Sequence, residues 1–301
     1  MLTKKLDDAK ALEEEQKSAE AISIYEEIIA HKFADADEIN DENVRCKEQA
    51  SYRLAGIFQS LSLFDEMVDL TKMILPLYVD MPKSKTGKII RTLFDMVIRF
   101  PGASNKGRYD QLIALSMHII KWCESESRSF LRMKIESKLS DLYFKQQRYQ
   151  DALEILNKLL YELKKKDDKN LIVESQLIES KVYHALENLP KAKAALTAVK
   201  TTANSIYVVP MLQAEIDMMS GLISADEKDY STSYSYFYET FEGYRSMNEI
   251  ELAGNAFKFM LFSKVMNKQP DDCMNLINSS ISLKFQGRDV DAMKAVAQAS
   301  K

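Results

Sequence analysis

Residues 143–163 read YFKQQRYQDALEILNKLLYEL and carry the spacing on which the architecture rests. A bulky Tyr143 is followed nine residues later by the small Ala152. Large residues, Leu156 and Leu159, follow four and seven positions further on. This spacing is typical of a tetratricopeptide-like hairpin, in which the small residue lies where two antiparallel helices come closest. The stretch therefore predicts two helices joined by a short turn.

The same spacing recurs along the chain. It is clear in Tyr183, Ala192, Leu196 and Val199 and in Leu12, Ala21, Tyr25 and Ile28, and weaker in Phe58, Met67, Thr71 and Ile74 and in Ser224, Ser233, Phe237 and Thr240. The small positions are about 40 residues apart, which is longer than the usual ~34. A wider gap, from Met67 to Ala152, has room for two units. The repeats predict an all-α solenoid in which each hairpin packs mainly on its neighbours.

Composition agrees with an all-helical chain. Among 301 residues there are only 8 Gly and 6 Pro, against about 36 expected from average usage. Sheet proteins need these residues for tight turns. Apolar residues (46%) and charged residues (29%) are interspersed with helical periodicity, and its breaks divide the chain into about fourteen helices. We expect an elongated monomer with a solenoid over residues 1–225 that continues over residues 226–301.

No pattern of catalytic, cofactor or metal chemistry stands out. His31, His118 and His184 have no partner at ligand spacing, and the chain has no P-loop, GxGxxG or GxSxG motif. The sequence therefore predicts a protein that is not an enzyme and binds no cofactor or metal. The net charge of −4 argues against nucleic acid as a partner, and no apolar run is long enough for a membrane span. Three distant cysteines suit a reducing compartment.

Two segments suggest surfaces for protein partners. Four cations, Lys83, Lys85, Lys88 and Arg91, lie within nine residues with no acidic residue among them. Three of them recur every three residues, which places them along one side of a helix. This basic stripe predicts either a contact with an acidic protein or a merely solvated face. Residues 230–244, YSTSYSYFYETFEGY, hold more aromatic residues than one buried helix face needs. We expect Phe237 and Phe241 in the core, with Tyr234 and Tyr238 beside them.

Four segments resemble a known family. They are residues 130–169 (FLRMKIESKLSDLYFKQQRYQDALEILNKLLYELKKKDDK), 173–207 (VESQLIESKVYHALENLPKAKAALTAVKTTANSIY), 229–244 (DYSTSYSYFYETFEGY) and 292–301 (AMKAVAQASK). Together they are similar to the proteasome lid subunits that carry a PCI module. Residues 83–93 (KSKTGKIIRTL) fit the same family.

The resemblance implies a right-handed α-solenoid that leads into the helical part of a PCI module. It implies a non-catalytic scaffold that joins the lid and the ATPase ring to the α-ring of the core particle, for ubiquitin-dependent degradation. The partners would be lid, α-ring and ATPase-ring subunits, in the cytoplasm and nucleus. The family's winged helix has no counterpart before Lys301, so we expect an N-terminal fragment.

Two other functions compete with this interpretation. The first is a tetratricopeptide-type adaptor that binds acidic peptide tails, although its regular repeats of about 34 residues fit the longer step here poorly. The second is a scaffold like COP9 signalosome subunit 2. That subunit begins with an acidic tail, and this chain does not.

Overall fold

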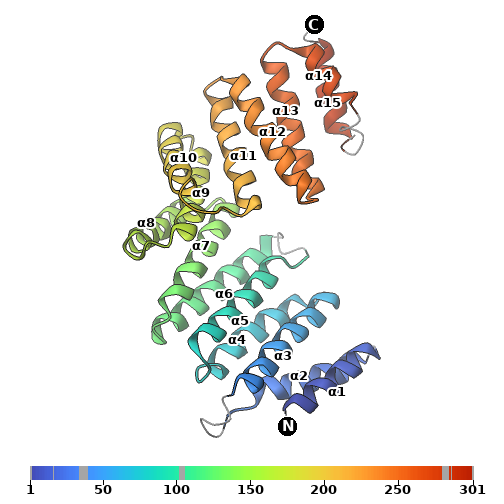
Figure 1. Cartoon of the computed structure of the whole chain (residues 1–301), viewed down its shortest axis with the longest axis vertical. Helices are drawn as coiled ribbons and strands as arrows, with labels where there is room; N and C mark the ends of the chain where they lie inside the picture. The colour runs from blue at the N-terminus through green and yellow to red at the C-terminus, as the bar shows by residue number, and fades with distance from the viewer. Residues whose placement is uncertain are drawn as a thin grey trace. The chain divides into compact units, whose positions relative to one another are not determined.

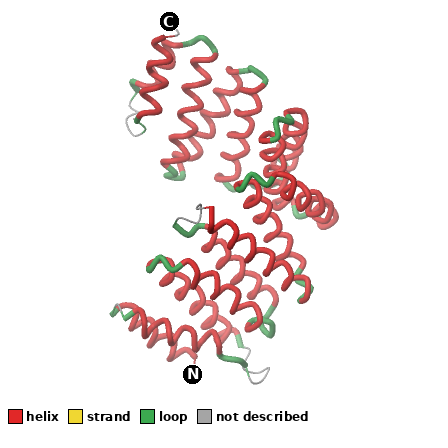
Figure 2. Tube along the Cα trace, turned by 180° about the vertical axis from the view of Figure 1, so that it is seen from behind, coloured by secondary structure: helices red, strands yellow, loops and turns green. Residues whose placement is uncertain are grey.

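The computed structural model describes residues 2–15, 17–33, 40–101, 106–279, 285 and 287–299. Within these residues all regular structure is helical and comprises fifteen α-helices (Figure 1 and Figure 2). The expected fourteen is one too few, because an unexpected turn over Leu61–Leu63 separates two helices. That turn has leucines in place of the Gly or Pro that usually mark a break. The chain forms two compact units, residues 1–147 and 148–301.

The first unit is a succession of helices in which neighbours along the chain pack together. α1 packs on α2, α3 on α4 and α6 on α7, while α3 also meets α5 and α5 meets α7. Contacts between next-but-one neighbours are how a solenoid stacks its hairpins. Its helices are α1 (Leu2–Glu14), α2 (Ser18–Ala30), α3 (Asp41–Ser60), α4 (Phe64–Leu77), α5 (Lys83–Ile98), α6 (Lys106–Ser125) and α7 (Ser129–Lys145).

The second unit continues the same construction. α9 packs closely on α10, and α12 packs closely on both α11 and α13. Its aromatic core contains Phe237, Phe241 and Phe257, each almost fully buried. Its helices are α8 (Tyr149–Lys166), α9 (Lys169–Ala185), α10 (Leu189–Ala203), α11 (Pro210–Asp226), α12 (Tyr230–Ser246), α13 (Ile250–Met266), α14 (Pro270–Ile277) and α15 (Arg288–Ala299).

The predicted repeat positions are buried in both units. The side chains at the small position, Ala21, Met67, Ala152, Ala192 and Ser233, are all 0% exposed. Two hydrogen bonds cross between facing helices at this position. The Ser180 hydroxyl of α9 donates to the Ala192 carbonyl of α10 at 2.9 Å, and the Ser233 hydroxyl of α12 donates to the Gly221 carbonyl of α11 at 3.0 Å. The all-α hairpin architecture is therefore confirmed, and even the poorly fitting Met67 occupies its expected place.

The turns between helices explain how a chain so poor in glycine forms hairpins. Among the described residues, eight other than glycine have left-handed φ values of 51–65°, each just after a helix: Ser62, Ser127, Gln147, Asp167, Glu187, Lys228, Asn248 and Lys268. After α9, for example, the amide of Asn188 donates to the Tyr183 carbonyl at 2.9 Å, and the amide of Glu187 donates to the His184 carbonyl at 2.9 Å. This is the Schellman arrangement, which satisfies the last carbonyls of a helix.

The expected division at residue 225 lies near the end of α11, inside the second unit. The proposal that residues 226–301 lead into a PCI module stays a prediction. The observed division between the units falls instead at the turn between α7 and α8.

Candidate functional site: a basic pocket between α5 and α7

The predicted basic stripe lies at the start of α5, and its four members have different surroundings. Lys83, Lys88 and Arg91 are exposed, whereas Lys85 is half-buried. The Lys88 ammonium forms an ion pair with the Glu48 carboxylate of α3 at 2.8 Å, and the pair raises the pKa of Lys88. Within the described residues, neither Lys83 nor Arg91 has an ion pair. The stripe is thus a partly neutralised row and not a uniform patch.

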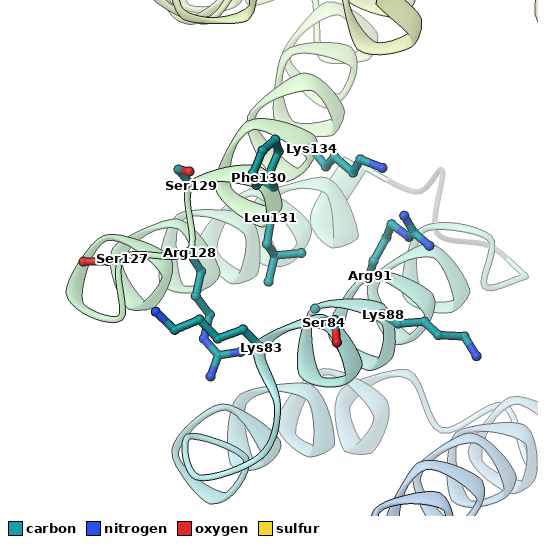
Figure 3. A pocket seen from close by; sticks show the side chains of 11 residues that line it. Lys83, Ser84, Lys88, Arg91, Ser127, Arg128, Ser129, Phe130, Leu131 and Lys134 are labelled. Carbon is teal, nitrogen blue, oxygen red and sulfur yellow. The ribbon is translucent and has the colours of Figure 1, made fainter. Parts of the chain in front are cut away.

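A pocket of about 520 Å³ lies beside this row (Figure 3). Its lining comes from the first turns of α5, from the turn before α7 and from the first turns of α7: Lys83, Ser84, Gly87, Lys88, Arg91, Ser127, Arg128, Ser129, Phe130, Leu131 and Lys134. Five of these side chains are cations and none is an acid. Lys85 is not among them. The structure therefore joins three of the four predicted residues to two cations from a distant part of the sequence, Arg128 and Lys134.

Arg128 is the most constrained of the five cations. Its side chain is only 6% exposed, and Figure 3 shows it pointing from the start of α7 toward α5. The guanidinium lies over the Trp122 ring at 4.7 Å, and its Nη2 atom donates to the Val79 carbonyl at 3.3 Å. The other two nitrogens, Nε and Nη1, are buried without a hydrogen-bond partner. Burial lowers the pKa of Arg128 and outweighs the opposite effect of the nearby Glu126 carboxylate.

Two helix N-termini add to the positive character of the pocket. α5 begins at Lys83 and α7 at Ser129. Neither helix has an acidic residue in its first turn or a side-chain cap. The N-terminus of a helix carries a partial positive charge, so acidic residues stabilise it and basic ones do not. Lys83 and Lys85 in the first turn of α5 oppose this preference. Their placement at this end is unfavourable for the helix.

The aromatic segment on α12 departs in part from its expected arrangement. Phe237 and Phe241 are buried as predicted, and Tyr234 packs against the same core. Tyr244 is also in the core, whereas Tyr238 is 41% exposed and stacks on Tyr234 at 6.5 Å. The placement of Tyr238 beside the core was therefore wrong, because it lies one position beyond the buried row of Phe237, Phe241 and Tyr244.

Neither a metal centre nor a reactive thiol is found among the residues that the structure describes. There, no three His, Cys, Asp or Glu side chains are grouped as a metal site would require. All three cysteines are buried, and burial raises the pKa of the Cys123 thiol to about 12, so it is not an activated nucleophile. Among the same residues, no helix has the length and apolar character needed to cross a membrane.

The stacked hairpins place the chain among the α-solenoids of tetratricopeptide-like type. Two solved structures share this fold over 98% of the chain, both with a TM-score of 0.56. They are a Rap protein complexed with competence and sporulation factor (12% identical, 77% of its chain covered) and the apo form of the quorum sensor NprR from B. thuringiensis (11% identical, 80% covered). At this identity the likeness concerns the fold alone.

Sequence comparison identifies the family. Residues 2–146 match the family described as the 26S proteasome regulatory subunit RPN6 N-terminal domain. The 26S proteasome regulatory subunit RPN6 of Saccharomyces cerevisiae is 34% identical over 304 residues, which cover 98% of the chain and 69% of that protein. The chain therefore belongs to the RPN6 family of 26S proteasome regulatory subunits.

Two further relatives agree. The probable rpn6 of Schizosaccharomyces pombe is 39% identical over 93% of the chain, and the non-ATPase regulatory subunit 11 homolog of Arabidopsis thaliana is 39% identical over 95%. The chain spans 64% and 65% of the length of these two relatives.

Proposed function

We propose that the chain is a non-catalytic scaffold of the proteasome's regulatory lid. In this role it joins the lid and the ATPase ring to the α-ring of the core particle, in the cytoplasm and nucleus, and so serves ubiquitin-dependent degradation. The observation that carries the proposal is the family relationship, which extends over nearly the whole chain. Stacked hairpins support it, because they present extended surfaces to protein partners.

The basic pocket supplies a surface for one of these contacts. Lys83, Arg91 and Lys134 line it as cations without ion pairs in the described residues, on a chain whose net charge is −4. Charges at the rim of an interface mainly steer association and fix its register. We assign this surface to an acidic face of a proteasome subunit.

The test is co-sedimentation. The tagged chain is expressed in cells, and the lysate is fractionated on a glycerol gradient, with peptidase activity and mass spectrometry of each fraction. A lid scaffold migrates with assembled proteasomes and is recovered with lid subunits. Migration only as a free protein would contradict the proposal.

One specific observation favours a second candidate, an adaptor that binds acidic peptide tails. The pocket has five cations and no acid, as capture of such a tail requires. The same gradient separates the two candidates, because an adaptor of this type sediments independently of proteasomes and retains short acidic peptides by itself.

A further inference from the structure

The pocket between α5 and α7 has a strongly positive lining that contains no acidic residue. Four features, the last of which concerns one of the five cations, meet at one pocket of about 520 Å³. They are five cations without a lining acid, two helix N-termini without caps, three serine hydroxyls, and a buried guanidinium with unpaired nitrogens. A solvated basic surface would explain the exposed cations, but it does not explain the buried Arg128.

The guanidinium is the decisive feature. Buried polar groups in native proteins are nearly always hydrogen-bonded, so each exception calls for a cause. The Trp122 ring and the Val79 carbonyl hold Arg128 in place, yet two of its nitrogens are left without acceptors. Desolvation of Arg128 outweighs the attraction of the Glu126 carboxylate, and a charge buried in this way is costly without a closer counter-charge. An incoming anion with several acceptor oxygens would supply both the charge and the missing hydrogen bonds.

We propose that this pocket binds a phosphorylated side chain on a peptide segment of a protein partner, with Arg128 as its anchor. A phosphoryl group carries about two negative charges and three strong acceptor oxygens, whereas a carboxylate carries one charge. Helix N-termini and arginine clusters are recurrent binding sites for phosphoryl groups. Ser84, Ser127 and Ser129 also line the pocket, and a serine hydroxyl can donate to a phosphoryl oxygen, but Figure 3 shows the Ser127 hydroxyl turned away from Arg128.

The apolar part of the lining determines what else the ligand contains. Leu131 points from α7 toward α5 in Figure 3, and Phe130 is 65% exposed at the same pocket. A volume of about 520 Å³ is far larger than a phosphate ion and leaves room for neighbouring side chains of a peptide. A peptide segment with leucine beside the phosphorylated residue would match both the apolar and the cationic parts of the lining. The inference does not depend on the proposed scaffold role.

The test measures peptide binding to the purified 301-residue chain by fluorescence anisotropy. The probe is a labelled peptide with one phosphoserine between two leucines, flanked by glutamates. Two matched peptides carry glutamate or serine in place of phosphoserine. We expect the phosphopeptide to bind at least about tenfold more tightly than either, since hydrogen bonds to charged groups are the stronger ones. Equal binding of all three peptides, or no binding of the phosphopeptide at millimolar concentration, would overturn the proposal.

Variants locate the binding site. Arg128→Gln should weaken phosphopeptide binding at least about tenfold, because Arg128 is the proposed anchor, and Lys134→Gln should weaken it a few-fold, because Lys134 lines the same pocket. The matched control is Lys138→Gln, which removes an exposed lysine from the same helix outside the pocket and should leave the dissociation constant unchanged. Because Arg128 is buried, its variant is used only if its circular dichroism matches the wild type. Lys134→Gln and Arg91→Gln, in contrast, alter partly or fully exposed groups.

Two competitors test whether the pocket recognises a phosphoryl group on a peptide or free inorganic phosphate. Unlabelled phosphopeptide should displace the probe, and inorganic phosphate should do so only at concentrations at least about a hundredfold higher, because it lacks the apolar contacts. Displacement by inorganic phosphate as effective as that by the peptide would refute recognition of a peptide. Unaltered phosphopeptide binding in both Arg128→Gln and Lys134→Gln would place the binding elsewhere and refute the assignment of the pocket.

Discussion

Lys47 shows at the residue scale what a buried charge costs this protein. Its side chain is only 1% exposed, beneath the Phe33 ring at 4.4 Å and the Tyr78 ring at 5.3 Å. The ammonium donates to the backbone carbonyls of Ile29, at 3.4 Å, and His31, just after the end of α2. These bonds tie α3 to the end of α2. Burial lowers the pKa of Lys47 to about 8.

This shift predicts a pH dependence of stability. Between the folded pKa of about 8 and the ordinary value of 10.5, the unfolded chain binds the additional proton, so stability rises with pH. From pH 7 to 9.5 this gain amounts to about 1–2 kcal/mol. The Lys47→Met variant should not show this gain in stability. Urea unfolding of the wild type and of the variant at each pH measures the difference.

The variant is also the control for other groups that titrate in this range. The buried thiols have raised pKa values, so they lower stability with rising pH in both proteins. The prediction therefore concerns the difference between the wild type and Lys47→Met. A difference that stays constant from pH 7 to 9.5 would show that Lys47 keeps an ordinary pKa.

The left-handed turn residues are a second feature at this scale. Lys228 has a φ of 65° in the turn between α11 and α12, where L-residues other than glycine are strained. Lys228→Gly should therefore raise the free energy of unfolding by about 0.5–1 kcal/mol in urea. Lys138→Gly, in the interior of α7, should lower it by about 1 kcal/mol. Destabilisation by both changes would contradict the strain argument.

At the scale of elements, the hairpins depend on close approach at one position. Ala192 is completely buried, and its carbonyl accepts a hydrogen bond from Ser180 of the facing helix. α11 and α12 also approach one another closely. A Cβ added to Gly221 would lie 2.5 Å from the Phe237 ring. Small residues are thus required where these two pairs of helices meet.

The corresponding prediction is that Ala192→Leu overpacks the contact between α9 and α10. Added methyl and methylene groups in a filled core cost about 1–3 kcal/mol. Ala194→Leu, on the exposed side of the same helix, should change stability by less than about 0.5 kcal/mol. Urea unfolding of both variants measures this. If both variants changed the free energy of unfolding equally and only slightly, Ala192 would not lie at the contact between α10 and α9.

The helices and their packing were predictable from sequence because apolar periodicity and the nine-residue spacing act locally. Positions such as Ala21, Ala192 and Ser233 were assigned from spacing alone and are buried. The turn at Leu61–Leu63 was not predicted, because it lacks the Gly or Pro that usually marks a turn.

The pocket was only half predictable from sequence. Lys83 and Arg91 are close in sequence, but Arg128 precedes α7 and Lys134 lies in it, and only packing brings α7 to α5.

At the scale of the whole molecule, the cations of the pocket belong to a chain with a net charge of −4. A local positive surface on such a chain selects partners by charge, and salt screens its attraction over about 8–10 Å. Lys88 contributes less to this surface than its position suggests, because Glu48 neutralises it. The remaining exposed charge depends most on Lys83, Arg91 and Lys134.

Neutralising those three should therefore weaken binding to the core particle. The variant Lys83→Gln, Arg91→Gln and Lys134→Gln keeps the Lys88–Glu48 pair intact, whereas a Glu at position 88 would oppose Glu48. Each exposed pair contributes about 0.2–1 kcal/mol, so we expect an affinity about threefold to a hundredfold lower at low salt. The wild type should lose more affinity than the variant as salt rises.

The matched control removes the same charges elsewhere in the first unit, through Arg99→Gln, Lys121→Gln and Lys138→Gln, all exposed and outside the pocket. Both triple variants change the net charge from −4 to the same value, so any difference between them reflects position and not total charge. Binding of each purified chain to purified core particle is measured at low and moderate salt. If both variants bind alike at low salt, the basic residues of α5 form a solvated face and contribute nothing to this contact.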